Sequence, residues 1–110
     1  QSFIMKLLEG KVSIVTGAAR GIGASIARRL AEQGSHVAFT YVSESSAEKA
    51  LALEQELTAL GVQAKAYRSH AGDFAQCETF VNEVLQQFGT VDVCVNNAGI
   101  SKDNLLLRMN

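Results

Sequence analysis

The stretch that decides the fold is VTGAARGIGAS, residues 15–25, in which three glycines fall within seven residues. The glycines come directly after the apolar segment VSIV at residues 12–15. They lead into residues 22–33, whose apolar side chains recur at helical spacing. Glycine costs backbone entropy and buries no side chain, so a cluster of glycines between a strand and a helix needs a reason. In a parallel sheet such a junction opens at the carboxyl edge, where the helix N-terminus offers free N–H groups to an anion. The stretch therefore predicts a phosphate-binding loop.

Each glycine of this loop has its own expected role. We expect Gly17 to allow a tight turn off the strand, Gly21 to let the backbone approach a pyrophosphate, and Gly23 to let helix and strand pack closely. The spacing, Gly-x-x-x-Gly-x-Gly, differs from the G-x-G-x-x-G fingerprint. A turn that only needs a positive φ would explain one glycine and not three. The loop therefore favours nucleotide binding.

Short segments rich in valine alternate with longer segments of helical period. The predicted strands are residues 11–17, 36–42, 62–71 and 91–99. Strand–helix alternation with short connections predicts an α/β fold, a parallel sheet covered by helices on both faces. Right-handed crossovers restrict it to a Rossmann-like, doubly wound sheet with strand order 3-2-1-4. In the last strand we expect Val91, Val93 and Val95 on one side of the sheet and Cys94 on the other.

Three helices are predicted between the strands. The first covers residues 22–33, the second starts near Ser45 because Ser45-x-x-Glu48 fits a capping box, and the third starts at the N-cap Asp73. Glycines follow all three as stop signals. The predicted apolar stripes are Ile22, Ile26, Ala27, Leu30 and Ala31 in the first helix, Ala50, Leu53, Leu57 and Leu60 in the second, and Phe74, Cys77, Phe80, Val81, Val84, Leu85 and Phe88 in the third.

The composition is that of one ordinary globular domain. The 110 residues are 47% hydrophobic and 19% charged, with a net charge of −1. No run of like charges indicates a nucleic-acid partner or a membrane surface, no apolar stretch approaches the roughly 20 residues that span a bilayer, and no signal-peptide layout is seen. We interpret residues 1–4 as the remnant of an expression tag, which leaves residues 5–110 as part of a single domain.

Cys77 and Cys94 fall in a predicted helix and a predicted buried strand. Without CxxC or Cys/His spacing, they indicate neither a metal site nor a disulfide. We expect two buried free thiols in a reducing cytoplasm.

The residues after the second strand indicate which dinucleotide would bind. NAD sites place an acid at the end of this strand, whereas here Tyr41 is followed by Val42 and Ser43, with no acid until Glu44. Arg20 in the loop, with Ser43 nearby, would favour a 2′-phosphate. We therefore predict NADP(H) over NAD(H). The alternatives are that Arg20 is a solvated loop residue and that Glu44 is a ribose ligand rather than a helix-start charge.

Two motifs resemble the short-chain dehydrogenase/reductase family. TGAARGIG at residues 16–23 is similar to its TGxxxGxG cofactor loop, and NNAG at residues 96–99 is similar to its second signature. The tail NNAGISKDNLLLRM is closer still to one branch, the 3-oxoacyl-[acyl-carrier-protein] reductases of fatty-acid synthesis. The resemblance implies the cofactor-binding residues Gly17, Ala18, Ala19, Arg20, Gly21, Ile22, Gly23, Val42, Ser43, Asn97, Ala98 and Gly99.

The second signature contains two asparagines, and a histidine lies near the end of the third predicted strand. Asn97 would line the adenosine ribose, although asparagine before glycine also suits a turn, and Asn96 is expected to be a structural hydrogen bonder. After the third strand the family has an acid or amide that grips adenine, followed by a small residue. Here His70 and Ala71 occupy those places, so the adenine contact departs from the family pattern. His36 is expected to be structural.

The chain lacks the family's catalytic residues. The family uses a tyrosine with a lysine four residues later, but Tyr41 is followed at that spacing by Ser45, and Tyr67 by Ala71. Two interpretations follow: an N-terminal part of a complete reductase, or a nucleotide-binding module without chemistry. The first implies NADPH-dependent reduction of a 3-oxoacyl thioester, linked to acyl carrier protein, to the 3-hydroxyacyl thioester, in a cytoplasmic homotetramer. A sugar, steroid or small-ketone reductase is the alternative substrate class.

The charged residues near the end of the chain leave two interpretations open. Lys102, Asp103 and Arg108 either lie at the mouth of the substrate site or form a solvated charge cluster.

Overall fold

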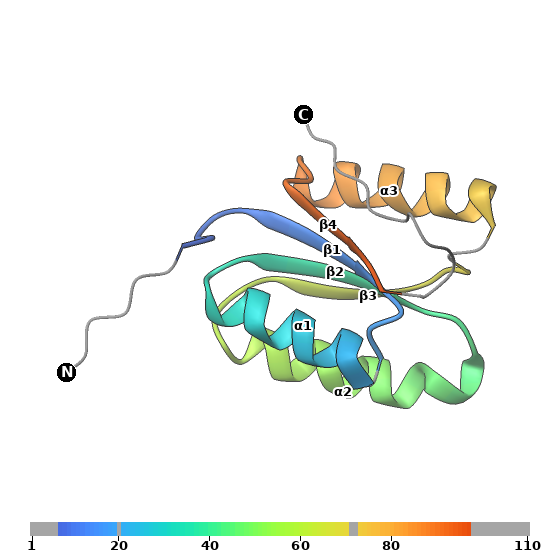
Figure 1. Ribbon diagram of the computed structural model, residues 1–110, viewed down its shortest axis with the longest axis horizontal. Helices are drawn as coiled ribbons and strands as arrows, with labels where there is room; N and C mark the ends of the chain where they lie inside the picture. Colours follow the sequence, from blue (N-terminus) through green and yellow to red (C-terminus); the bar gives the residue numbers. More distant parts are fainter. Residues whose placement is uncertain (1–6, 20, 71–72, 98–110) are drawn as a thin grey trace.

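The computed structural model describes residues 7–19, 21–70 and 73–97 and contains a four-stranded sheet with helices on both faces (Figure 1). Every strand pair is parallel, and the strand order is β3-β2-β1-β4, as the sequence predicts. Helices α1 and α2 cover one face and α3 covers the other. The strands are β1 Val12–Thr16, β2 His36–Tyr41, β3 Ala64–Arg68 and β4 Val93–Asn96, and the helices are α1 Gly21–Glu32, α2 Ala47–Thr58 and α3 Phe74–Phe88. The predicted α/β class and doubly wound, Rossmann-like arrangement are confirmed.

The register brings the ends of the strands together at one edge of the sheet. Thr16 at the end of β1 pairs with Asn96 of β4, and Tyr41 at the end of β2 pairs with Arg68 of β3. Because all four strands are parallel, these four residues and the loops that follow them share the carboxyl edge, where ligands of such sheets bind.

Two apolar cores lie on the two faces of the sheet. The strand β1 is buried along its whole length, with Val15 facing α1 and α2 and Ile14 facing α3. We call the first group of buried side chains the α1–α2 core and the second the α3 core. The α1–α2 core includes Val15, Ala27, Val37, Phe39 and Leu57, and the α3 core comprises Val12, Ile14, Ala38, Phe80 and Val84. Near-continuous apolar strands are typical of parallel sheets that are covered on both faces.

The apolar stripe predicted for the first helix is partly wrong. Ile22 is 72% exposed, whereas the buried residues of α1 are Gly23, Ala24, Ala27 and Ala31. These small residues let the helix lie close to the sheet, and Ile22 projects from the opposite side of the helix. Ile26 and Leu30 contact the α1–α2 core only at its margin.

The second helix begins near Ser45, as predicted, but the predicted capping box is wrong. A short 3₁₀ turn, η1 Glu44–Ser46, comes first, and α2 begins at Ala47 without a side-chain cap. The hydroxyl of Ser45 instead lies 2.9 Å from that of Ser43, so no capping box forms. Leu60 lies beyond the end of α2 and is 43% exposed. The predicted burial of Ala50, Leu53 and Leu57 is confirmed.

The third helix begins as predicted. The carboxylate of Asp73 accepts a 3.1 Å hydrogen bond from the backbone N–H of Gln76, and Gly89 ends the helix in the left-handed conformation. Of the predicted stripe, however, only Phe80 and Val84 are fully buried. Phe74 is 81% exposed and Leu85 is 42% exposed, because α3 covers the sheet with a narrower stripe than its sequence suggests.

The last strand differs from the prediction at its start. Val91 precedes β4 and packs in the α3 core on the same side as Cys94, while Val95 packs on the α1–α2 core. Strand alternation therefore does not extend back to Val91. Cys77 and Cys94 form no disulfide within the described residues, and each is half-buried, where the sequence predicts buried thiols.

Candidate functional site

The loop between β1 and α1 is fixed to the end of β2. Gly17 has a φ of +66°, which is the tight turn that the sequence predicts. Its N–H donates a 2.9 Å hydrogen bond to the hydroxyl of Thr40, and the N–H of Ala18 donates a 3.0 Å bond to the Thr40 carbonyl oxygen. The loop therefore has a defined backbone path at the carboxyl edge of the sheet.

Gly23 is the point of closest packing between α1 and this loop. A Cβ atom at Gly23 would meet the carbonyl oxygen of Gly17, and it would lie 2.6 Å from the Nδ2 atom of Asn97 and 2.8 Å from the Cα atom of Ala18. No residue other than glycine fits these contacts without a shift of the loop. The expectation that Gly23 permits close packing is confirmed. We call Gly17, Gly21, Gly23 and the residues between them the glycine corner.

The end of β4 supports the glycine corner from the other side. Asn97 donates a 3.2 Å hydrogen bond from Nδ2 to the carbonyl oxygen of Gly17, and Asn96 accepts a 2.9 Å bond from the hydroxyl of Thr16. Asn96 is thus a structural hydrogen bonder, as expected. Asn97 positions the loop, a role that the sequence did not reveal because its partner lies 80 residues away.

Gly21, at the start of α1, lies where the described residues leave space. It has a φ of +66°, and a Cβ atom built there would meet none of the described residues within 4 Å. The first turn of α1 contains no acidic residue, so nothing there opposes the positive end of the helix dipole. This exposed backbone suits a bound pyrophosphate.

The segment after β2 is exposed and has no acid next to the strand. Val42 and Ser43 are both exposed, and the Ser43 hydroxyl lies 2.9 Å from that of Ser45 and 3.2 Å from that of Ser46. Arg68, at the end of β3, donates a 2.9 Å hydrogen bond from Nε to the carbonyl oxygen of Val42. The sequence analysis missed Arg68, because only the pairing of β3 with β2 brings its side chain to this segment.

Other predicted site residues are placed as follows. His70 lies just beyond β3 and is exposed, and its N–H donates a 2.7 Å hydrogen bond to the side-chain oxygen of Gln76. Arg20, Ala71, Ala98 and Gly99 lie outside the described residues, as do Lys102, Asp103 and Arg108.

The half-buried cysteines do not form a reactive site. Burial, with a smaller contribution from Asp73, raises the pKa of the Cys77 thiol, and burial raises the pKa of the Cys94 thiol, with a smaller contribution from Cys77. Thiols with raised pKa values are protonated at neutral pH and are poor nucleophiles. Within residues 7–19, 21–70 and 73–97, no cluster of three or more His, Cys, Asp or Glu side chains could hold a metal ion.

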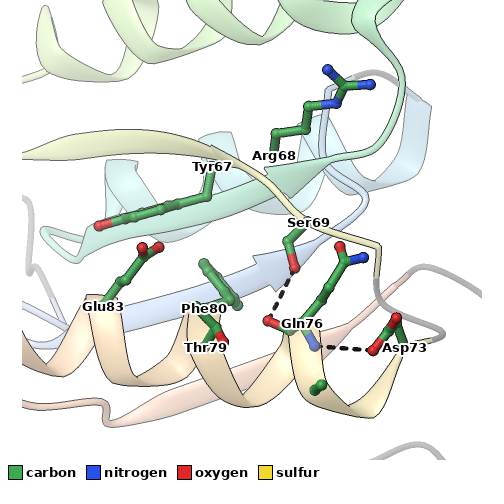
Figure 2. A pocket seen from close by; sticks show the side chains of 9 residues that line it. Tyr67, Arg68, Ser69, Asp73, Gln76, Thr79, Phe80 and Glu83 are labelled. Carbon is green, nitrogen blue, oxygen red and sulfur yellow. Dashed lines mark hydrogen bonds between the residues drawn. The ribbon is translucent and has the colours of Figure 1, made fainter.

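A groove of about 280 Å³ lies between β3 and α3 (Figure 2). The ring of Tyr67 on β3 contacts that of Phe80 on α3 edge-on, with a centroid distance of 5.2 Å. Figure 2 shows Glu83 projecting from α3 toward the Tyr67 ring. The Tyr67 hydroxyl is buried and has no hydrogen-bond partner among the described residues. Its burial, followed by the charges of Glu83 and Glu54, raises the pKa of Tyr67.

An open parallel sheet of order 3-2-1-4, with helices on both faces and a glycine-rich turn after β1, defines the class of Rossmann-like α/β domains. Within that class, residues 11–110 match the family model described as short chain dehydrogenase. The chain belongs to the short-chain dehydrogenase family. In the part of the chain that the structure describes, no helix is long and apolar enough to cross a membrane.

Two similar proteins are bacterial 3-oxoacyl-[acyl-carrier-protein] reductases. The chain is 50% identical over 99 residues to the 3-oxoacyl-[acyl-carrier-protein] reductase FabG of Staphylococcus aureus, which covers 90% of this chain and 39% of the relative. It is 44% identical over 101 residues to FabG of Escherichia coli, covering 92% of this chain and 39% of the relative. The chain thus spans about two fifths of the length of these relatives.

Solved structures of similar fold include complexes with nicotinamide cofactors. A blue fluorescent protein from a metagenomic library, in complex with NADPH, is 54% identical with a TM-score of 0.82, over 86% of this chain and 38% of that one. A short chain dehydrogenase from Burkholderia cenocepacia, in complex with NADP, is 45% identical with a TM-score of 0.80, over 91% and 42%. An NAD+-bound xylitol dehydrogenase is 34% identical with a TM-score of 0.79, over 86% and 35%.

Proposed function

We propose that residues 5–110 form the N-terminal, cofactor-binding part of an NADP-dependent short-chain reductase. The observation that carries this proposal is the glycine corner. Gly17 and Gly21 have positive φ values, Gly23 lies against the loop without room for a side chain, and no described residue covers Gly21 at the start of α1. These features suit a pyrophosphate that accepts hydrogen bonds from backbone N–H groups at a helix N-terminus.

The choice of NADP(H) over NAD(H) rests on the end of β2. A carboxylate at that position would bind the ribose hydroxyls of NAD and repel a 2′-phosphate, but Tyr41 is followed by Val42 and Ser43. Arg20 is the loop cation that we expect to favour the phosphate. Similar structures in complex with NADPH and with NADP support this choice, although the xylitol dehydrogenase holds NAD+.

The remaining site residues take supporting roles in this proposal. Ala18, Ala19 and Ile22 would border the phosphates, and Asn97, Ala98 and Gly99 the adenosine ribose. His70 and Ala71 would lie at the adenine, where a ring next to the strand end offers stacking.

For the whole protein we propose reduction of a 3-oxoacyl thioester to the 3-hydroxyacyl thioester in fatty-acid synthesis. The bound cofactor would supply the hydride, and the family's catalytic tyrosine and lysine have no counterpart in this sequence, so the 110 residues alone should show no turnover. The support is 50% identity to a FabG reductase over 90% of this chain. A substrate linked to acyl carrier protein, a homotetramer and a cytoplasmic location belong to the same proposal.

One observation favours a second substrate class. A xylitol dehydrogenase, whose substrate by name is a sugar alcohol, has a similar fold over 86% of this chain. A reductase of a sugar, steroid or small ketone is therefore the alternative, and a nucleotide-binding module without chemistry is the alternative from another class.

The test uses the full-length protein that contains this chain. Calorimetric titration should show tighter binding of NADPH than of NADH, and Arg20→Glu should reduce that preference. Acetoacetyl thioester should consume NADPH faster than a sugar or a steroid ketone does. Absence of heat with either nucleotide would reject the cofactor site, binding without turnover of any ketone would favour the module, and faster turnover of the sugar would select the alternative substrate class.

A further inference from the structure

Arg68 is a cation that the fold holds against the segment after β2. It is the last residue of β3 and pairs in register with Tyr41, the last residue of β2. Its Nε atom donates a 2.9 Å hydrogen bond to the carbonyl oxygen of Val42. Figure 2 shows the guanidinium directed away from the side chains of α3 that line the groove. Neighbouring strand residues point to opposite faces, so Tyr67 occupies the groove while Arg68 crosses the edge of the sheet toward β2.

The charge of Arg68 has no partner among the described residues. Arg28, by comparison, forms an ion pair with Glu56 at 2.6 Å. Within residues 7–19, 21–70 and 73–97, Arg68 has no carboxylate within ion-pair distance, and only its Nε atom is engaged, by a neutral carbonyl. Neither terminal amino group of its guanidinium is engaged by the part of the chain that the structure describes. A planar fork of this kind matches the oxygens of a phosphate better than an ammonium group does.

The position of this cation suits one part of the proposed cofactor. In Rossmann domains the adenosine ribose lies at the end of the second strand, and an arginine near that point accommodates a 2′-phosphate. We propose that Arg68, together with the exposed hydroxyl of Ser43, binds the 2′-phosphate of NADP(H) and is a determinant of its selection over NAD(H). This inference rests on the proposed function. It adds to the cofactor site a residue from β3, whereas Arg20 belongs to the loop after β1.

The test compares ligands that differ only in the 2′-phosphate. Calorimetry on the full-length protein measures binding of 2′,5′-ADP against ADP, and of NADPH against NADH. Arg68→Gln should weaken 2′,5′-ADP and NADPH by about 10- to 100-fold, the range for a hydrogen bond to a charged group. Binding of ADP and NADH should stay unchanged. Arg68→Lys should recover part of the loss, because lysine keeps the charge but not the fork.

The matched control removes the same charge elsewhere. Arg29→Gln changes an exposed arginine in the last turn of α1, at the far end of that helix from the glycine corner, and should leave all four affinities unchanged. If Arg68→Gln weakens the ligands with and without the 2′-phosphate equally, Arg68 only anchors the Val42 carbonyl and the inference is wrong. Retained preference in Arg68→Gln also rejects it, while the NADP proposal stands. No preference in the unchanged protein rejects both.

Discussion

Two of the three loop glycines are needed for different physical reasons. At Gly23 the limit is space, because a side chain would meet the carbonyl oxygen of Gly17 and the amide of Asn97. At Gly21 the limit is the backbone, because φ is +66° while the space above it is open. Substitutions at these two positions should therefore affect stability and cofactor binding in different proportions.

Gly23→Ala should destabilise the protein and weaken the cofactor together. The added methyl group forces the loop and Asn97 away from α1, and overpacking of this kind costs about 1–3 kcal/mol. Thermal unfolding and NADPH titration of the full-length protein measure both effects. Ser25→Ala, at an exposed position on the same helix, is the control and should change neither. An unfolding temperature of Gly23→Ala equal to that of the unchanged protein would contradict the close packing.

Gly21→Ala should weaken the cofactor more than its effect on stability accounts for. Alanine in the left-handed region costs about 1–2 kcal/mol wherever it is placed. Gly10 has a φ of +82° with open space around it, but it lies in the turn before β1, away from the glycine corner. Gly10→Ala should therefore lose similar stability and bind NADPH normally. Equal NADPH affinity in both variants would show that no ligand approaches Gly21.

At the scale of elements, the outer strand β3 is protected by its neighbours. The carboxylate of Glu54 on α2 accepts a 2.9 Å hydrogen bond from the backbone N–H of Ala66, which points outward from the sheet. Exposed strand edges invite pairing with other chains, and a charged side chain over the edge prevents it. The same carboxylate is one of the charges that raise the pKa of Tyr67, the residue that follows Ala66 in β3. Glu54 therefore both covers the exposed edge of β3 and adds negative charge near the Tyr67 hydroxyl.

The contact between β3 and α3 should make stability depend on alkaline pH. The pKa of Tyr67 is raised in the folded state, so above the ordinary tyrosine value of about 10 the unfolded chain loses a proton that the folded chain keeps. Stability of the unchanged protein should then fall between about pH 9 and about pH 11 more than that of Tyr67→Phe. Glu83→Gln should reduce this loss, because one of the charges that raise the pKa is removed. Denaturant unfolding at each pH measures the difference, and parallel curves for Tyr67→Phe and the unchanged protein would disprove it.

At the scale of the whole molecule, local sequence signals predicted the architecture. Valine-rich segments, helical stripes and crossover handedness were enough for the 3-2-1-4 order, and glycine spacing was enough to locate the corner. Features that depend on how elements meet were not predictable in this way. Ile22 is exposed because α1 packs on the sheet through its glycine and alanine side. The hydrophobicity of Ile22 alone predicts the opposite.

The same limit explains why the sequence analysis found only part of the candidate site. The loop after β1 offers the cation Arg20, and the end of β2 offers the hydroxyl of Ser43, both from local sequence alone. Arg68 is 25 residues beyond Ser43 and reaches the site only through the pairing of β3 with β2. The available signal was an arginine within the predicted strand 62–71, two residues before His70. The sequence alone does not place Arg68 beside the end of β2. That placement follows only when the strand order is combined with the register of β3 against β2.

The two cores should behave as independent sites within one cooperative unit. Val37 belongs to the α1–α2 core and Val84 to the α3 core, and both are fully buried on opposite faces of the sheet. Val37→Ala and Val84→Ala should each lower the free energy of unfolding by about 1–3 kcal/mol, because each removes the same two methyl groups from a packed site. The double variant should lose the sum within about 0.5 kcal/mol, since the two side chains share no contacts. Because β1 contributes to both cores, each variant should still unfold in one transition, and none should change the NADPH-to-NADH preference. Two separate transitions, or a strongly non-additive double variant, would show that the faces do not share one cooperative sheet.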